Sequence, residues 1–348
     1  MSDGDETPLL HRREPELKGT LPHLPLSDRP TPVREMTALA EASGCRAQVW
    51  VKDDGAYGNG GWGGNKVRKL EWILPEAKRR GAKKLMTVGG LGTNWGLAAS
   101  LYGRDQGLET VLALIDQPVD EHVVAQQERL RASGAVIHRT HTKARTIALA
   151  PALYLRHFSG LTAPYFLPAG GSSPIGALGY VEGALEIADQ VAAGDLPEPS
   201  HVVVAVGSGG TAAGLAVGLR IAGLRTKVLG IVVNDSLPLD AKALTRLAGR
   251  TEDLLRERGA RLPAAGAGGG AGPAIETSEE WLGHGYGHPT AASEEARRRC
   301  EESEGMALDP VYTAKAMSGL LAIDAAGGFG DGPVLFVQTD GPRDPAVS

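Results

Sequence analysis

The stretch that decides the fold is "HVVVAVGSGGTAAGLAVGLRIAGLRTKVLGIVV", residues 201–233. Two short apolar runs rich in valine, 201–207 and 227–233, flank a segment of helical length. Short continuous apolar runs are typical of strands that are buried on both faces, as in parallel sheets covered by helices. The stretch therefore predicts a strand–helix–strand unit and an α/β fold.

The same alternation extends in both directions along the chain. Further buried strands are predicted over 47–54, 83–90, 110–116, 135–140 and 332–341, with helices between most of them and a long amphipathic helix at 176–194. We expect two α/β units, each an open, mostly parallel twisted sheet flanked by helices. In such folds ligands bind beyond the carboxyl ends of the strands.

The composition is that of an ordinary globular protein. Of the 348 residues, 42% are hydrophobic and 22% are charged, and the net charge is -5. A slightly acidic chain argues against a nucleic-acid partner. The chain has no apolar run long enough to span a membrane, and its N-terminus lacks the apolar core of a signal peptide. We therefore expect a cytoplasmic protein with no membrane partner.

A few segments and residues carry little functional signal. Residues 1–26 are polar and contain proline, which predicts a disordered tail, and 262–274 predict a low-complexity connection. Cys45 and Cys300 lack the spacing of a zinc or redox motif. His284 and His288 lie in a loop rich in glycine, so they do not form a helical pair of metal ligands and no metal is expected.

A turn of small residues follows the strand at 201–207. It consists of Gly207, Ser208, Gly209, Gly210 and Thr211, and a helix follows directly. This geometry directs free backbone N–H groups and the positive end of the helix dipole toward an anion, and the two hydroxyl groups can add donors. We interpret the turn as an anion-binding cradle; a tight turn with nothing bound is the alternative.

One rival function uses the same turn. Gly207, Gly209 and Ala212 match the spacing G-x-G-x-x-A of dinucleotide-binding sites, and Asp235 follows the next strand. A nicotinamide-dependent oxidoreductase is therefore an alternative at this point.

A second stretch, "GGWGGNKVRKLEWI" at 60–73, places two lysines at the start of a helix after four glycines. Lys66 and Lys69 are three residues apart and so share one helix face. A desolvated lysine beside another cation has a lowered pKa and can form a Schiff base. Pyridoxal phosphate needs such a lysine and a separate phosphate cradle, and this chain offers both. A solvated basic helix face is the alternative.

The lysine stretch also carries a family resemblance. "GGNKVRKLEWILPEA" (63–77) closely resembles the lysine loop of the fold-type II, tryptophan synthase beta-like pyridoxal-phosphate enzymes of the D-cysteine desulfhydrase and 1-aminocyclopropane-1-carboxylate (ACC) deaminase family. Other family motifs follow in order, and the resemblance runs from about Pro30 to Gly341. These motifs are "KDD" (52–54), "GYVEGALEI" (179–187), "GSGGT" (207–211), "GYGHP" (285–289) and "LDPVYTAKAM" (308–317).

The resemblance implies a domain division and a set of cofactor contacts. A large pyridoxal-phosphate-binding domain would comprise 27–67 and 179–348, and a small domain 68–178. Lys66 would form the internal aldimine and move the substrate's α proton, and Lys69 would contact the phosphate together with the turn from Gly207 to Thr211. Asn94 would hydrogen-bond the ring hydroxyl. Thr339 would face the pyridine nitrogen, where a neutral hydroxyl leaves the ring a milder electron sink, as elimination requires.

The substrate face departs from the family. Tyr286 and Tyr312 resemble the two family tyrosines, but where relatives carry Gln-Ser-Asn-His this chain has Gly-Thr-Asn-Trp at 92–95. Thr93 keeps the hydroxyl that contacts the substrate carboxylate in relatives, and Asn94 and Trp95 complete the substrate wall. Trp95 in place of histidine either packs away from the site or changes the substrate. The catalytic set is thus Lys66, Thr93, Tyr286 and Tyr312.

The resemblance favours a lyase that removes the α proton and a β substituent from D-cysteine or a related small amino acid, giving a 2-oxo acid and ammonia. ACC deamination is less favoured because Thr313 stands where ACC deaminases tend to have glutamate. A specialised enzyme for β- or γ-replacement, and a family member that binds without turnover, also remain alternatives. A homodimer is expected from the family alone.

Overall fold

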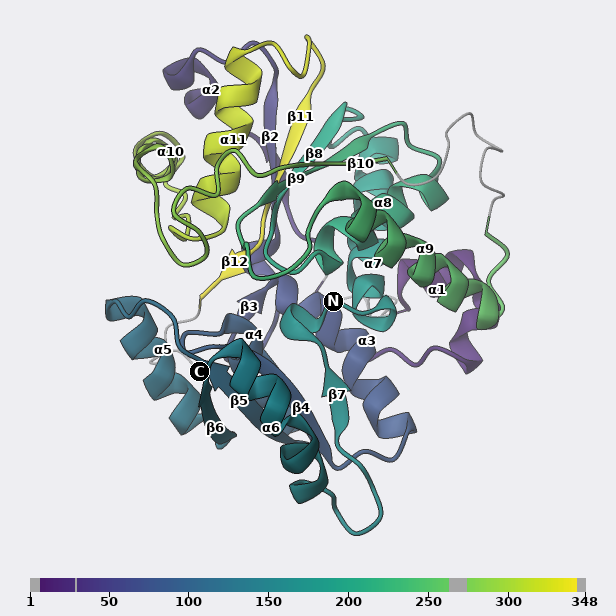
Figure 1. Cartoon of the computed structure of the whole chain (residues 1–348). Coiled ribbons are helices and arrows are strands. Elements are labelled where there is room, and N and C mark those ends of the chain that lie inside the picture. The colour runs from purple at the N-terminus through teal and green to yellow at the C-terminus, as the bar shows by residue number, and fades with distance from the viewer. Residues whose placement is uncertain (1–6, 29, 263–273, 343–348) are drawn as a thin grey trace.

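The computed structural model describes residues 7–28, 30–262 and 274–342. It contains two open sheets with helices on their faces, one of six strands and one of four. Figure 1 shows the six-stranded sheet in the upper part of the molecule and the four-stranded sheet in the lower part. The predicted α/β fold with two mostly parallel sheets is confirmed. No helix in the described part of the chain is long and apolar enough to cross a membrane.

The six-stranded sheet has the order β1-β2-β11-β8-β9-β10. Only the pair of β1 and β2 is antiparallel. Alternate residues of β8 enter two different cores, with Val202 and Val204 in one and Val203 in the other, because both faces are covered by helices. The strands are β1 (Val33–Glu35), β2 (Val49–Asp53), β8 (His201–Val206), β9 (Lys227–Val232), β10 (Ile275–Ser278) and β11 (Val334–Gln338).

Two groups of helices cover this sheet (Figure 1). One face carries α7 (Pro174–Ala193), α8 (Gly210–Ala222) and α9 (Ala241–Glu257). The other face carries α2 (Thr37–Ser43), α10 (Ala291–Glu304) and α11 (Thr313–Ala325). The strand–helix–strand unit predicted from residues 201–233 is β8-α8-β9, in the centre of this sheet.

The four-stranded sheet has the order β6-β5-β4-β7, and all its pairs are parallel. Its strands are β4 (Lys84–Gly90), β5 (Glu109–Ile115), β6 (Val136–His141) and β7 (Tyr165–Leu167). The helices of this part are α3 (Asn65–Arg79), α4 (Asn94–Asp105), α5 (Glu121–Ala132) and α6 (Lys143–Arg156).

The predicted domain limits separate the two sheets but do not coincide with element ends. Every strand of the four-stranded sheet lies within 68–178, and every strand of the six-stranded sheet lies outside it. Both limits, however, fall inside helices, one in α3 and one in α7. These two helices pack against each other, so they join the two halves.

The N-terminal segment is ordered over its described residues, and the expectation of a disordered tail up to residue 26 is wrong there. Residues 7–26 include α1 (Leu9–Arg13) and the short helix η1 (Pro15–Gly19). Leu10, Leu17 and Leu21 are fully buried, and the Glu182 carboxylate on α7 accepts hydrogen bonds from the first turn of α1. The apolar contacts outweigh the polar composition that suggested disorder. Residues 1–6, and 263–273 of the predicted low-complexity connection, lie outside the described residues.

A buried group of charges fixes the position of α3. Arg68 is fully buried and donates to Asp54 at 2.8 and 2.9 Å and to Glu186 of α7 at 2.9 and 2.8 Å. Lys52 of β2 lies 3.1 Å from Glu186, and Tyr180 donates to Asp54. Burial raises the pKa of Glu186, but Arg68 and Lys52 outweigh it and hold that pKa at about 2. The network joins α3 to β2 and α7.

We predict that Arg68→Leu destabilises the protein by about 3–5 kcal/mol, because it leaves the buried Asp54 carboxylate without a cation and Glu186 with Lys52 alone. Urea unfolding of the variant and the wild type measures the difference. Arg13→Leu is the matched control: its partner Asp189 is exposed, so that change should cost less than about 1 kcal/mol. Equal effects of the two substitutions would contradict the assigned role of the buried network.

Candidate active site

Lys66 lies on the first turn of α3, directly after a close contact between two chain segments. The short strand β3 (Gly63–Gly64) pairs antiparallel with β12 (Asp340–Gly341). Gly64 has a φ of +85°, and a Cβ there would lie 2.5 Å from the Thr339 carbonyl oxygen. The glycines are thus required by the approach of one backbone to another. This approach brings Lys66 beside Thr339 and Asp340.

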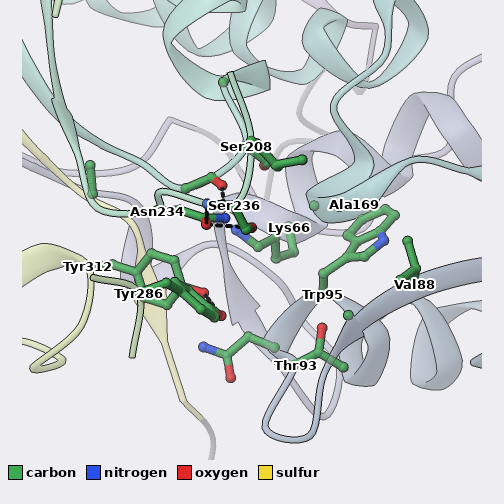
Figure 2. A pocket seen from close by; sticks show the side chains of 18 of the residues that line it. Lys66, Val88, Thr93, Trp95, Ala169, Ser208, Asn234, Ser236, Tyr286 and Tyr312 are labelled. Atoms are coloured by element: carbon green, nitrogen blue, oxygen red, sulfur yellow. Dashed lines mark hydrogen bonds between the residues drawn. The ribbon is translucent and has the colours of Figure 1, made fainter. Parts of the chain in front are cut away.

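A cavity of about 410 Å³ opens in front of Lys66. Figure 2 shows Lys66 between Ser208 and the tyrosine pair, with Trp95 and Thr93 on the other side. Of the residues predicted to be catalytic or to bind cofactor or substrate, all but Gly210 line this cavity. They are Lys66, Lys69, Thr93, Asn94, Trp95, Gly207, Ser208, Gly209, Thr211, Tyr286, Tyr312 and Thr339.

The pKa of the Lys66 amine is lowered toward neutral pH. Its Nζ donates to Asn65 Oδ1 at 2.9 Å, and Asn65 Nδ2 donates to Thr211 Oγ1 at 3.2 Å. Burial lowers the pKa of Lys66 to about 8, while the carboxyl groups of Asp340 and Asp309 act in the opposite direction. Because the pKa is lower than that of an ordinary lysine, more of the amine is neutral and nucleophilic near pH 7.

The second lysine lies at the turn between β8 and α8. Lys69 Nζ donates to the Gly170 carbonyl at 3.0 Å, and no carboxylate of the described residues pairs with it. Burial, assisted by the nearby charge of Lys66, lowers the pKa of Lys69. A buried cation without a counter-ion favours an anionic ligand at this place.

The turn itself offers donors around that lysine. Gly209 precedes α8 with a φ of +87°, and the Gly210 N–H donates to Ser172 Oγ at 2.9 Å. A Cβ on Gly210 would lie 2.7 Å from Ser172 Oγ and 3.2 Å from Lys69 Nζ, so only glycine fits there. Ser172 Oγ in turn donates to Ser208 Oγ at 2.8 Å. Sequence reasoning missed Ser172, which belongs to a different segment. The turn and the Lys69 amine, which has no carboxylate partner among the described residues, fit a phosphate group.

The wall formed by 92–95 is held by its own hydrogen bonds. Thr93 Oγ1 caps α4 by accepting from the Gly96 N–H at 3.1 Å. Trp95 is buried, and its Nε1 donates to Thr87 Oγ1 at 2.9 Å. A Cβ on Gly171 would lie 2.6 Å from the Trp95 ring. The ring is thus packed firmly, and Trp95 is also one of the residues that line the cavity.

Two glutamine side chains beside this wall were missed by sequence reasoning. Gln117 Oε1 accepts from the Gly92 N–H at 3.2 Å, and Gln117 lines the cavity. Gln126 Nε2 donates to Asn94 Oδ1 at 2.6 Å. Neither glutamine lies in a recognisable motif. Gln117 reaches the wall from just after β5 and Gln126 from α5, so their proximity to the wall could not be seen in the local sequence.

The two tyrosines form a pair. Their hydroxyl oxygens are 2.5 Å apart, and their rings are in edge contact. Burial raises the pKa of both phenols. The Tyr286 N–H donates to Asp235 Oδ1 at 3.2 Å. Asp235, the acidic residue of the nicotinamide alternative, therefore fixes the loop that carries Tyr286.

Three aspartates also line the cavity, Asp116, Asp309 and Asp340, and sequence reasoning gave them no role. Asp309 accepts from the Tyr312 N–H at 2.6 Å and from the Thr313 N–H at 2.9 Å, so it holds the start of α11. Asp340 is desolvated and lies near Asp309. Burial and then the Asp309 charge raise the pKa of Asp340 to about 8, although Lys66 opposes this.

The raised pKa of Asp340 predicts a pH effect on stability. Between its ordinary value of 3.8 and about 8, folded Asp340 keeps a proton that the unfolded chain has released. The contribution to stability therefore falls as the pH rises through this window. Lys66 acts in the opposite direction, but only above about pH 8. Asp340→Asn should flatten the decline in melting temperature of the cofactor-free protein between pH 5 and pH 8. An unchanged slope in the variant would refute this assignment.

Comparison with known proteins agrees with this geometry. Residues 24–340 match the model of the family described as pyridoxal-phosphate dependent enzyme. The chain belongs to this family. The enzyme is 34% identical to the D-cysteine desulfhydrase of Salmonella choleraesuis (strain SC-B67) over 330 residues, which are 92% of this chain and 94% of the relative. The D-cysteine desulfhydrase of Salmonella newport (strain SL254) is 33% identical with the same coverage.

Solved structures support the same assignment. An ACC deaminase homologue superposes with a TM-score of 0.77 at 27% identity and covers 96% of this enzyme and 95% of its own chain. The processed threonine deaminase isoform 2 from Solanum lycopersicum, at 16% identity, shares the fold with a TM-score of 0.61 and covers 99% and 87%. The enzyme is thus a fold-type II enzyme.

The cofactor of the family is pyridoxal phosphate, and the residues of the cavity fit it. Lys66 offers an amine of lowered pKa, and Lys69 with the β8–α8 turn offers a phosphate site without a competing carboxylate. The match to the pyridoxal-phosphate family favours this cofactor over the nicotinamide cofactor of the alternative function. Among the described residues there is no group of three or more side chains that could hold a metal ion.

Proposed function

We propose that this enzyme is a lyase that removes the α proton and a β substituent from a small amino acid. D-cysteine is the leading substrate: with one water molecule it would give pyruvate, ammonia and hydrogen sulfide. The observation that carries the proposal is the Lys66 amine of lowered pKa, which shares one cavity with a hydrogen-bonded tyrosine pair. The similarity over nearly the whole length to D-cysteine desulfhydrases supports the substrate class.

Each cofactor-binding side chain has a defined task in this proposal. When bound, pyridoxal phosphate supplies the electron sink that makes the substrate's α proton acidic. Lys69, with the turn of Gly207 to Thr211, binds the phosphate. Asn94 would donate to the ring hydroxyl, and Thr339 would offer an uncharged hydroxyl to the ring nitrogen. Lys66 would hold the cofactor and would accept the substrate's α proton.

The substrate side chains act around the reacting carbons. The Thr93 hydroxyl, with Asn94 beside it, binds the substrate carboxylate. Tyr286 and Tyr312 share one short hydrogen bond, so one phenol can donate a proton to the leaving group while the other stabilises the resulting charge. Trp95 adds an apolar surface to the wall and limits the size of the side chain that fits.

The cavity bears differently on the two alternative reactions, ACC deamination and β- or γ-replacement. Thr313, the position that bears on ACC deamination, is fully buried and donates to Asp309, so it does not line the cavity. A β- or γ-replacement reaction would use the same residues and would consume an added nucleophile. The homodimer expected from the resemblance remains a prediction.

The decisive experiment follows the cofactor and the products together. Enzyme reconstituted with pyridoxal phosphate should be yellow, should lose that band with borohydride, and should release pyruvate and sulfide from D-cysteine faster than from L-cysteine. Lys66→Ala should form no reducible bond and should lose activity by at least about 10²-fold. Lys78→Ala, at an exposed position of the same helix, is the matched control.

Several results would contradict the lyase proposal. One is a yellow wild type that releases no 2-oxo acid from any β-substituted amino acid tested. Another is Lys66→Ala with full activity. Turnover that requires an added thiol or amine, which appears in the product, would instead favour replacement.

The tyrosine pair generates a separate prediction. Tyr312→Phe or Tyr286→Phe should lower kcat by about 10²- to 10⁴-fold, because the pair loses its shared proton, and should leave cofactor binding intact. The double variant should be little worse than the more damaging single one, since the two groups act as a unit. Tyr154→Phe on α6, where the ring packs on Phe158 away from the cavity, is the control. Additive losses would argue for separate roles.

A further inference from the structure

The amide of Asn94 is connected to α5 by a chain of hydrogen bonds. Asn94 Oδ1 accepts from Gln126 Nε2 at 2.6 Å, and Gln126 Oε1 accepts from Arg129 Nη1 at 3.2 Å. Gln126 is fully buried, whereas Arg129 is partly exposed. Asn94 is the first residue of α4 and lines the cavity. The chain therefore runs from the surface through a buried glutamine to the active site.

The direction of these hydrogen bonds is fixed by the arginine. A guanidinium group can only donate, so the Gln126 amide must turn its oxygen toward Arg129 and its NH₂ toward Asn94. Only the oxygen of Asn94 can accept there, which leaves the Asn94 NH₂ group for the cavity. Among the described residues no acceptor is assigned to Asn94 Nδ2. The reversed Asn94 amide would set two NH₂ groups against each other.

We propose that Gln126, oriented by Arg129, is a positioning residue that makes Asn94 present an N–H donor, and not a carbonyl oxygen, to the ring hydroxyl position of pyridoxal phosphate. The inference rests on the contact of Asn94 with that hydroxyl, proposed above, and not on the identity of the substrate. A donor stabilises the ionised ring oxygen, and an acceptor stabilises its protonated form. The orientation of one amide thus selects between two states of the bound cofactor.

The two states differ in colour, which gives a readout independent of activity. The form with an ionised ring oxygen absorbs visible light, and the form with a protonated oxygen absorbs in the near ultraviolet. Gln126→Glu reverses the direction of the hydrogen bond with Asn94, because a carboxylate can accept from Arg129 and from Asn94 Nδ2 at once. Asn94 Oδ1 would then face the cavity. At one fixed pH the visible-to-ultraviolet absorbance ratio of the holoenzyme should fall about tenfold, as loss of a hydrogen bond to a charged group implies.

A matched control lies at the next position of the same helix. Gln127 Oε1 accepts from Arg131 Nη2 at 3.4 Å, so a second glutamine on α5 is paired with an arginine about one turn later, here four residues on and in an exposed contact. Gln127→Glu adds the same charge to α5 without touching Asn94. It should keep the wild-type spectrum.

A second background shows whether the effect passes through Asn94. In Asn94→Ala holoenzyme, Gln126→Glu should cause no further change in the absorbance ratio, because the amide that transmits the effect is gone. If Gln126→Glu alone does not fold, Arg129→Leu takes its place. That change removes a partly exposed side chain and frees both amides to turn, so it should lower the ratio in the same direction by a smaller factor.

Two results would overturn the inference: a Gln126→Glu holoenzyme with the wild-type ratio, and an equal fall in the Asn94→Ala background. A different result would refute the lyase proposal. A yellow wild type that releases no 2-oxo acid would refute the lyase and leave the positioning role intact. If the wild type releases 2-oxo acid and Gln126→Glu leaves the absorbance ratio unchanged, the positioning role is refuted and the lyase proposal stands.

Discussion

The position of the site depends on one buried charged contact, that of Arg68 with Asp54 and Glu186. Arg68 lies between Lys66 and Lys69 in the sequence but points to the opposite side of α3, toward β2 and α7. Because one carboxylate partner directly follows β2 and the other lies on α7, the helix has one rotation in which the Arg68 guanidinium is paired with both. In that rotation both lysines face the cavity. Such networks add less to net stability than to the choice of one arrangement.

The cavity combines groups whose ordinary charge states are disfavoured by burial. Lys66 and Lys69 are held in surroundings that lower their pKa, and Asp340 in surroundings that raise its pKa. A phosphate dianion would supply the charge that Lys69 lacks within the protein. The protein therefore holds its cofactor site in a prepared, electrostatically strained form, which is typical of catalytic centres.

The sequence predicted those parts of the structure that depend on local pattern. Valine-rich runs identified β8 and β9, and glycine-rich turns identified the segments around Lys66 and Gly209. It missed what depends on distant packing: Leu10, Leu17 and Leu21 are separated by polar residues and prolines, so their burial could not be seen locally. Ser172 and Gln126 reach the site from other elements, and no periodicity marks such contacts.

The close approach of β3 to β12 has a consequence for how such an enzyme can change its substrate. A Cβ on Gly55, Gly64 or Gly341 would lie about 2.5 Å or less from backbone atoms of the opposite segment. No side chain fits at any of these positions, so this part of the site cannot vary by stepwise replacement. The segment 92–95 has no such constraint on its Thr and Trp side chains. A change of side chain is therefore easier on that wall than at these glycines of the lysine side.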